Sequence, residues 1–304
     1  MSAFRGDPAI KAELIAMLDR DAPTPLNPPH DGRAPDLVAW AEEVGLPLAL
    51  VLLAGRLRFG SFRDDKTPGR FARELLSAIV PGADLAGAPH LWMVWAWDAA
   101  PEPLRSLMTS PANIDLAAQA VGLHRRAANG EVTGGEWRAM RARVNVLAGN
   151  GDEPARAAAV VAASLWDYRT TPGAVADLVQ AWESMRTERV RVAEAWGVAE
   201  DARYEEMLAE IRPLLRERVG PRPDRKDADA FSAYVTRFHA VFTALKGEFD
   251  SPLWDRNTTV HQKSGRACEI LREQGRTALI SLVAAGTASQ GRDPAHPEGL
   301  ASNV

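Results

Sequence analysis

Three tryptophans lie close together, at Trp92, Trp95 and Trp97. Indole rings line apolar ligand pockets and anchor partner proteins, because tryptophan is enriched at the energetic centres of interfaces. The surrounding segment is apolar on every side, however, and a helix of that kind is usually buried. We therefore interpret the cluster first as core and second as a binding site. Asp98 follows the cluster, and burial against it would raise the pKa of that carboxyl.

A cationic group, His124-Arg125-Arg126, falls near the end of a helix predicted to start at Pro111. Such a group can bind phosphate or an acidic partner. Cations at this position also complement the helix dipole and hydrogen-bond the last carbonyls. We favour the dipole interpretation, because it needs no further assumption, and keep all three residues as candidate binding residues.

Arginines recur in two further groups, which are Arg138, Arg141 and Arg143, and then Arg186, Arg189 and Arg191. A basic stripe of this kind could bind nucleic acid. Acidic residues interleave the second group, and the whole chain carries 36 Lys and Arg against 40 Asp and Glu, a net charge of −4. The pattern indicates solvated helix faces with local ion pairs, so nucleic-acid binding is not expected.

The sequence contains no motif for a metal site, a catalytic nucleophile or a phosphate-binding loop. The six histidines are dispersed, without the helical pairs that bind metals, and no nucleophile elbow or phosphate-binding glycine loop occurs. The one cysteine, Cys268, precedes Glu269, whose charge would raise the thiol pKa and keep it inert. We therefore expect no metal and no cofactor, and favour a protein that is not an enzyme.

The elements that position these residues are predicted to be helices. Capping side chains precede proline at four places, namely Asp7-Pro8, Thr67-Pro68, Ser110-Pro111 and Thr171-Pro172. Thr133 and Glu136 have the spacing of a capping box. No period-2 strand pattern occurs. The fold class is therefore all-α: an irregular array of helices followed by an antiparallel unit like a three- or four-helix bundle.

The last third of the chain predicts helices at about 200–218, 227–247 and 263–285. In the second of them, apolar residues recur at spacings of 4, 3, 4, 3 and 4, at Phe231, Val235, Phe238, Phe242, Leu245 and Phe249. This is the seam of helix-on-helix packing. The seam could pair across a two-fold axis in a homodimer, but packing within the chain's own bundle is the simpler interpretation.

The expected division of the chain follows these elements. It comprises an N-terminal helix at 1–20, a Pro-rich connection at 21–35, a helical array at 36–197, the antiparallel unit at 198–286 and a flexible tail at 287–304. The single cysteine excludes an internal disulfide, no signal peptide is evident, and no apolar run is long enough for a bilayer. The cytoplasm is therefore the expected location, and no membrane partner is expected.

Residues 88–170 resemble the alanine-rich helical immunity proteins of bacterial polymorphic-toxin systems, specifically the fifth such family. The resemblance rests on Trp95-Ala96-Trp97-Asp98, on Gly130-Glu131-Val132 with Glu136-Trp137, and on the alanine-rich residues 155–159. Trp166-Asp167-Tyr168 stand where that family would have a histidine, so no functional residue is carried over. The resemblance implies a non-enzymatic binding protein.

These observations favour a cytoplasmic protein-binding module, of immunity or adaptor type, whose partner is another protein. One alternative is an all-α enzyme or small-molecule binder with an apolar pocket beside the tryptophans. Another is a nucleic-acid-associated regulator that uses the arginine faces. The candidate ligand- or partner-binding residues are Trp92, Trp95, Trp97, Asp98, His124, Arg125 and Arg126.

Overall fold

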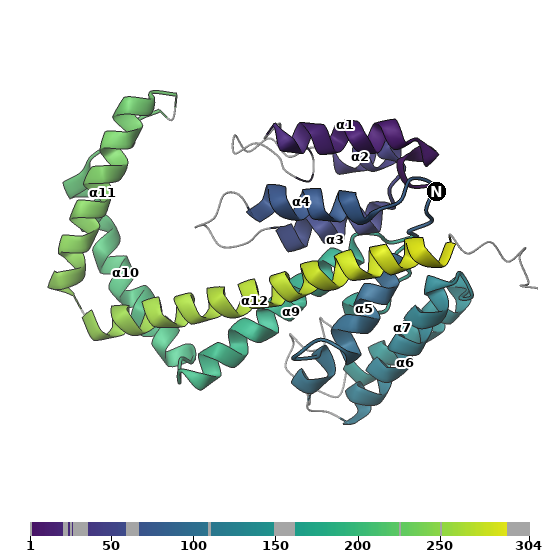
Figure 1. The fold of residues 1–304 in the computed structure, drawn as a ribbon. Helices are drawn as coiled ribbons and strands as arrows, with labels where there is room; N and C mark the ends of the chain where they lie inside the picture. Colours follow the sequence, from purple (N-terminus) through teal and green to yellow (C-terminus); the bar gives the residue numbers. More distant parts are fainter. Residues whose placement is uncertain are drawn as a thin grey trace, which may run out of the picture. The chain divides into compact units, whose positions relative to one another are not determined.

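The computed structural model (Figure 1) describes residues 2–20, 24, 26, 36–58, 67–108, 111–148, 162–224, 226–249 and 251–290. Over these ranges the protein is all-α and contains no strand, and an isolated β-bridge pairs Ser2 with Asp84. The predicted fold class is confirmed. None of the described helices is both long and apolar enough to cross a membrane.

The α-helices, in chain order, are α1 (Pro8–Asp19), α2 (Leu37–Val44), α3 (Leu48–Arg58), α4 (Thr67–Ala78), α5 (Ala88–Asp98), α6 (Pro111–Ala128), α7 (Gly134–Ala148), α9 (Ala174–Ala193), α10 (Val198–Val219), α11 (Ala228–Glu248) and α12 (Ser251–Gln290). Two 3-10 helices, at Ala3–Gly6 and Leu104–Leu107, complete the set.

Side-chain caps begin several of these helices, as their sequence predicts. Asp7 Oδ1 accepts a hydrogen bond from the Ala9 amide at 2.8 Å, directly before Pro8 starts α1. The capping box before α7 is reciprocal. The Thr133 amide donates to Glu136 Oε2 at 2.9 Å, and the Glu136 amide donates to Thr133 Oγ1 at 3.4 Å. These bonds satisfy amides that the first helical turn leaves without partners.

The chain divides into two compact units, and the sequence of one is inserted into that of the other. Unit 1 contains Met1–Met185 and Glu269–Val304, and unit 2 is Arg186–Cys268. This division differs from the expected 198–286, because the second half of α12 belongs to unit 1. Leu271, Leu279 and Val283 of that half lie fully buried in the unit 1 core. The Pro-rich connection at 21–35 and the tail at 287–304 lie mostly outside the described residues.

Helix α12 also starts earlier than its stripe predicts. It begins at Ser251 rather than near residue 263. Pro252 occupies its first turn, where proline is well tolerated. The stretch that follows contains Asn257, Thr258 and Thr259, whose helix propensity is low. Buried Leu253, Trp254 and Val260 outweigh that low propensity.

Within unit 1, α12 approaches α3 and α5 closely at Gly275. A Cβ atom at that position would lie 2.9 Å from Leu57 Cδ2 and 3.2 Å from Trp92 Cζ2. Both distances are shorter than ordinary van der Waals contact, so only glycine fits without displacing these side chains. The Trp92 indole N–H donates to the Gly275 carbonyl at 3.0 Å. Trp92 is therefore a docking contact for α12.

Candidate functional site

The tryptophan cluster lies inside unit 1. Trp92 and Trp97 are 0% and 1% exposed, and Trp95 is half-buried with its ring centroid 6.1 Å from that of Trp182. This confirms the interpretation of the cluster as core. The two buried indoles present no surface to a ligand, so the cluster does not support the expected apolar pocket.

The charged residues next to the cluster are paired with one another. Arg125 donates to Asp98 Oδ2 at 2.6 Å, and Arg105 lies 3.7 Å from the other oxygen of that carboxylate. The Asp98 side chain is 34% exposed, so the expected burial against the tryptophans is not found at this residue. Arg126 pairs with Glu136 of the capping box, whose pKa falls to about 2 because the Thr133 amide and the Arg126 guanidinium favour the carboxylate.

Arg125 and Arg126 lie in the last turn of α6, as the dipole interpretation requires, but His124 does not cap the helix, and the interpretation is wrong for this residue. Its imidazole is fully buried, and its Nδ1 lies 2.9 Å from Nδ1 of His90 on α5. Its Nε2 lies 2.6 Å from the Ser164 carbonyl oxygen. The rings of Trp137 and Tyr168 pack on it, each with its centroid 4.9 Å away. We call His90, His124, Trp137 and Tyr168 the histidine cluster.

The Ser164 carbonyl places one hydrogen on each imidazole. A carbonyl oxygen only accepts, so His124 Nε2 carries the hydrogen and donates. Neutral His124 then accepts at Nδ1 from the Nδ1–H group of His90. The other nitrogen of His90, Nε2, lies 3.4 Å from Asp167 Oδ1 and has no hydrogen-bond partner among the described residues. The cluster is a short chain of hydrogen bonds that ends at this nitrogen, beside a carboxylate.

Burial keeps these two histidines neutral. It lowers the pKa of His90 to about 4, with the nearby Arg169 charge contributing. It lowers the pKa of His124 to about 3, and the His90 charge adds to the effect. Burial also raises the pKa of Tyr168. Since neither imidazole reaches solvent, the cluster joins α5, α6 and residues 164–168, and it offers no accessible acid or base to a substrate.

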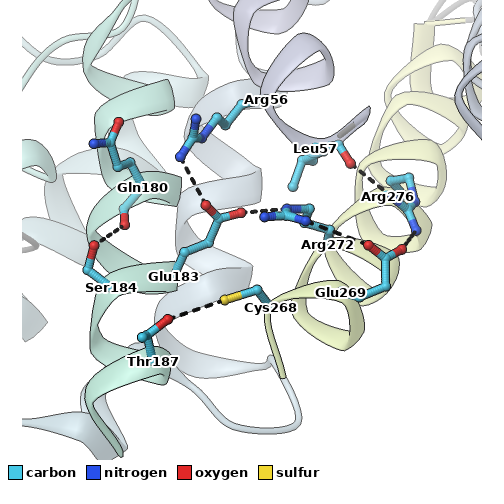
Figure 2. Close-up of polar contacts among 10 residues, drawn as sticks. All are labelled: Arg56, Leu57, Gln180, Glu183, Ser184, Thr187, Cys268, Glu269, Arg272 and Arg276. Carbon is cyan, nitrogen blue, oxygen red and sulfur yellow. Dashed lines mark hydrogen bonds and ion pairs between the residues drawn. The ribbon is translucent and has the colours of Figure 1, made fainter. Parts of the chain in front are cut away.

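A second polar cluster ties α12 to the rest of unit 1, and Figure 2 shows its members. Glu183 of α9 accepts from Arg56 Nη2 at 2.9 Å and from Arg272 Nε at 2.6 Å. Glu269 accepts from Arg276 Nη2 at 2.8 Å. Arg276 Nη1 also donates to the Leu57 carbonyl at 2.9 Å. These bonds join α3, α9 and α12, and the cluster is a structural clamp.

The remaining candidates are also engaged in the fold. Arg141 donates to the Leu165 carbonyl at 3.0 Å and lies over the Trp166 ring, and Arg191 pairs with Asp201. Cys268 is buried, with Thr187 Oγ1 3.7 Å from its sulfur (Figure 2). Among the described residues, no three His, Cys, Asp or Glu side chains gather as metal ligands would. Residues 155–159 of the resemblance lie outside the described ranges.

Unit 2 contains an apolar stripe that its own helices cover only in part. At its base, Met207, Ile211, Leu245 and Trp254 are buried together. Arg237, midway along α11, donates to the carbonyl of Val219, the last residue of α10. The N-terminal half of α11 therefore continues past the end of α10 (Figure 1). Only part of the predicted seam packs within the chain's own bundle.

Three half-buried side chains on this projecting half, Tyr234, Val235 and Phe238, form what we call the open stripe. The ring of Phe238 lies 6.4 Å from that of Tyr234 and 5.7 Å from that of Phe242, between centroids. Phe242 in turn meets buried Trp254 at 4.7 Å. One continuous row of rings thus runs from the closed core at Trp254 to half-buried Tyr234.

Sequence reasoning found the helical spacing of the open stripe but missed the histidine cluster. His90 and His124 are 34 residues apart, and no motif links them. The available signal was that His90 directly precedes the apolar segment of α5, where a buried histidine needs a polar partner.

No family model, no curated protein and no solved structure matches this chain. The resemblance of residues 88–170 to immunity proteins stays a prediction.

Proposed function

We propose that this chain is a non-enzymatic, cytoplasmic protein-binding module, and that the open stripe of α11 is its docking surface. The observation that carries this proposal is the row of rings that continues past the end of α10. Side chains that form a core where α10 lies beside α11 become half-exposed where α10 has ended. A helix laid along the projecting half of α11 would continue the same core.

The chemistry of the stripe defines the partner. Tyr234, Val235 and Phe238 carry no charge, so the matching surface is the apolar face of an amphipathic helix. Tyrosine and phenylalanine give large contact area, and the Tyr234 hydroxyl can hydrogen-bond at the rim. An adaptor or an immunity-type protein would use such a surface to hold its partner. The buried tryptophans favour no ligand pocket, so the enzyme alternative gains no support from them.

The test compares the wild-type chain with a stripe variant, Val235→Gln/Phe238→Gln. The control is Val80→Gln in unit 1, where the valine is 51% exposed. Each tagged protein is purified from its native host after cross-linking, and native mass spectrometry measures the stoichiometry of any bound protein. We expect one partner chain per copy for the wild type and the control, cross-linked to α11, and none for the stripe variant.

Equal retention by the stripe variant would exclude the open stripe as the docking surface. A bare wild-type chain, or one that carries only a small molecule, would overturn the protein-binding function itself. Circular dichroism of each variant checks that the helix content of the whole chain is unchanged, so that loss of the partner can be attributed to the substituted side chains.

A further inference from the structure

Charges on α10 are arranged in two blocks. Residues 198–210 hold five carboxylates and one arginine, whereas residues 211–219 hold three arginines and one carboxylate. At 100° per residue, Asp201, Glu205, Arg212 and Arg216 lie on one flank of the helix. The order along that flank is acid, acid, base, base. Such an order is complementary to itself when two copies of the helix run antiparallel.

This flank of α10 is accessible to solvent, and small side chains on it would let a second helix approach closely. Glu205 and Arg212 have side chains 64% and 55% exposed, and Arg216 is exposed too. Ala202 and Ala209 are small exposed residues between the charges, and Leu208 and Leu215 border them half-buried. Val198, at the start of the flank, is 84% exposed. A second helix would cover these apolar atoms.

We infer that α10 pairs antiparallel with α10 of a second copy of this chain, about a two-fold axis near residues 208 and 209. Glu205 of one copy then lies beside Arg212 of the other. Asp201, which also accepts hydrogen bonds from Arg191 and Trp196 of its own chain, lies beside Arg216. Leu208 of each copy packs beside Ala209 of its mate. Each of these contacts occurs twice, once in each direction across the axis, as an isologous interface requires. The inference goes beyond the proposed function, because it uses a different surface from the open stripe.

The free chain already contains part of this pairing. Arg212 Nη2 donates to Glu205 Oε2 of the same helix at 3.0 Å. An ion pair this exposed contributes little to stability, so replacing it with the pair between copies costs little free energy. Charge reversal can also distinguish the two ion pairs. A mixture of two oppositely charged variants restores the pair between copies, but it does not restore the pair within one helix.

The experiment is a charge exchange between two variants, Glu205→Arg and Arg212→Glu. In the first variant, positions 205 and 212 are both basic; in the second, both are acidic. Each variant alone therefore places like charges against each other across the two-fold axis. In a mixture, the basic flank of one meets the acidic flank of the other. Each chain's own pair stays broken in the mixture, so any recovery reports contact between copies.

Sedimentation velocity of the purified full chain at low salt measures the association. We expect the wild type to dimerise, each variant to associate at least tenfold more weakly, and the equimolar mixture to recover a heterodimer. Labelling one variant with a heavy isotope lets native mass spectrometry identify that heterodimer. Raising the salt concentration should weaken the wild-type dimer, because the paired charges are exposed.

A monomeric wild type at 100 µM, on the order of the concentration at which weak dimers are measured, would overturn the inference. Undiminished dimers of both variants would overturn it as well, because the contact would then lie elsewhere. Neither result affects the proposed function, which is judged on partner capture by the stripe variant Val235→Gln/Phe238→Gln. That variant leaves the α10 flank intact and should dimerise like the wild type.

Discussion

Two regions of this protein are both rich in large aromatic and apolar residues, but their surroundings in the structure are opposite. In unit 1 the indoles of Trp92 and Trp97 are 0–1% exposed, and the second half of α12 closes over Trp92. In unit 2 the rings of Tyr234 and Phe238 lie on a helix that continues past its neighbour. Aromatic density alone therefore does not separate a closed core from a half-exposed stripe. What separates them is whether another element of the chain covers the rings.

Replacing one aromatic residue in each region with alanine would test this difference most directly. Trp92→Ala should lower the free energy of unfolding by about 3–5 kcal/mol, because it leaves a cavity in the core and removes the bond to Gly275. Phe238→Ala removes a half-buried ring and should cost about 1 kcal/mol or less. Urea denaturation followed by circular dichroism measures both values. Similar losses in the two variants would contradict the contrast.

Acid should weaken unit 1 through the histidine cluster. His90 and His124 have folded-state pKa values of about 4 and about 3, below the ordinary 6.5. The unfolded chain therefore binds more protons as pH falls from 6.5 toward 3. The stability that the neutral pair provides is complete above pH 7 and decreases through that window.

Urea midpoints measured between pH 7.5 and pH 4 test the histidine prediction. His124→Gln should flatten the dependence on pH, whereas His239→Gln, at an exposed position of α11, should leave it unchanged. An identical slope in the wild type and the His124 variant would show that other groups cause the acid sensitivity.

The polar cluster of Figure 2, centred on Glu183 and Glu269, should contribute more to the free energy of unfolding than the exposed Glu205–Arg212 ion pair on α10. The Glu183 side chain is 10% exposed and forms ion pairs with both Arg56 and Arg272. Glu183→Gln leaves both guanidinium groups partly buried without that charge, and we expect a loss of about 2 kcal/mol. Glu205→Gln breaks a solvated pair and should cause no measurable change in thermal or urea stability. Equal losses of stability in the two variants would mean that the Glu183 ion pairs contribute no more than a surface ion pair.

The smallest expected effect concerns two glycines of α12. Gly275→Ala places a methyl group against Leu57 and Trp92 and should destabilise the protein by about 1–2 kcal/mol. A Cβ atom added at Gly265 would meet no packing neighbour within 4 Å among the described residues. Gly265→Ala should therefore stabilise the helix by up to about 1 kcal/mol. Opposite shifts of the melting temperature would confirm the close approach, and shifts of the same sign would contradict it.

Local features of the fold were predictable from the sequence because their causes are local. Asp7 before Pro8, and Thr133 with Glu136, satisfy amides within their own first turns, so the residues that form the cap also identify it. The apolar spacing of α10 and α11 predicted their extents to within one or two residues. The start of α12 was missed because Asn257, Thr258 and Thr259 have low helix propensity, and packing of their neighbours overrides it.

Contacts between distant residues were not predictable in the same way. The pairing of His90 with His124, and the fit of Trp92 against Gly275, depend on how α5, α6 and α12 pack, and no spacing rule connects them. The same holds for the candidate site. The sequence placed rings along one face of α11, but only the end of α10 determines which of them stay open.

The insertion of unit 2 into the sequence of unit 1 has a consequence for how the protein is made. A ribosome releases α3 and α5 long before it releases the part of α12 that covers Leu57 and Trp92. At synthesis rates of about 5–20 residues per second, the delay lasts roughly 10 to 35 seconds. During that interval the nascent chain exposes a large apolar surface that only its own later residues can cover. Ribosome-associated chaperones should bind this protein at that stage, and release it once Gly275 emerges.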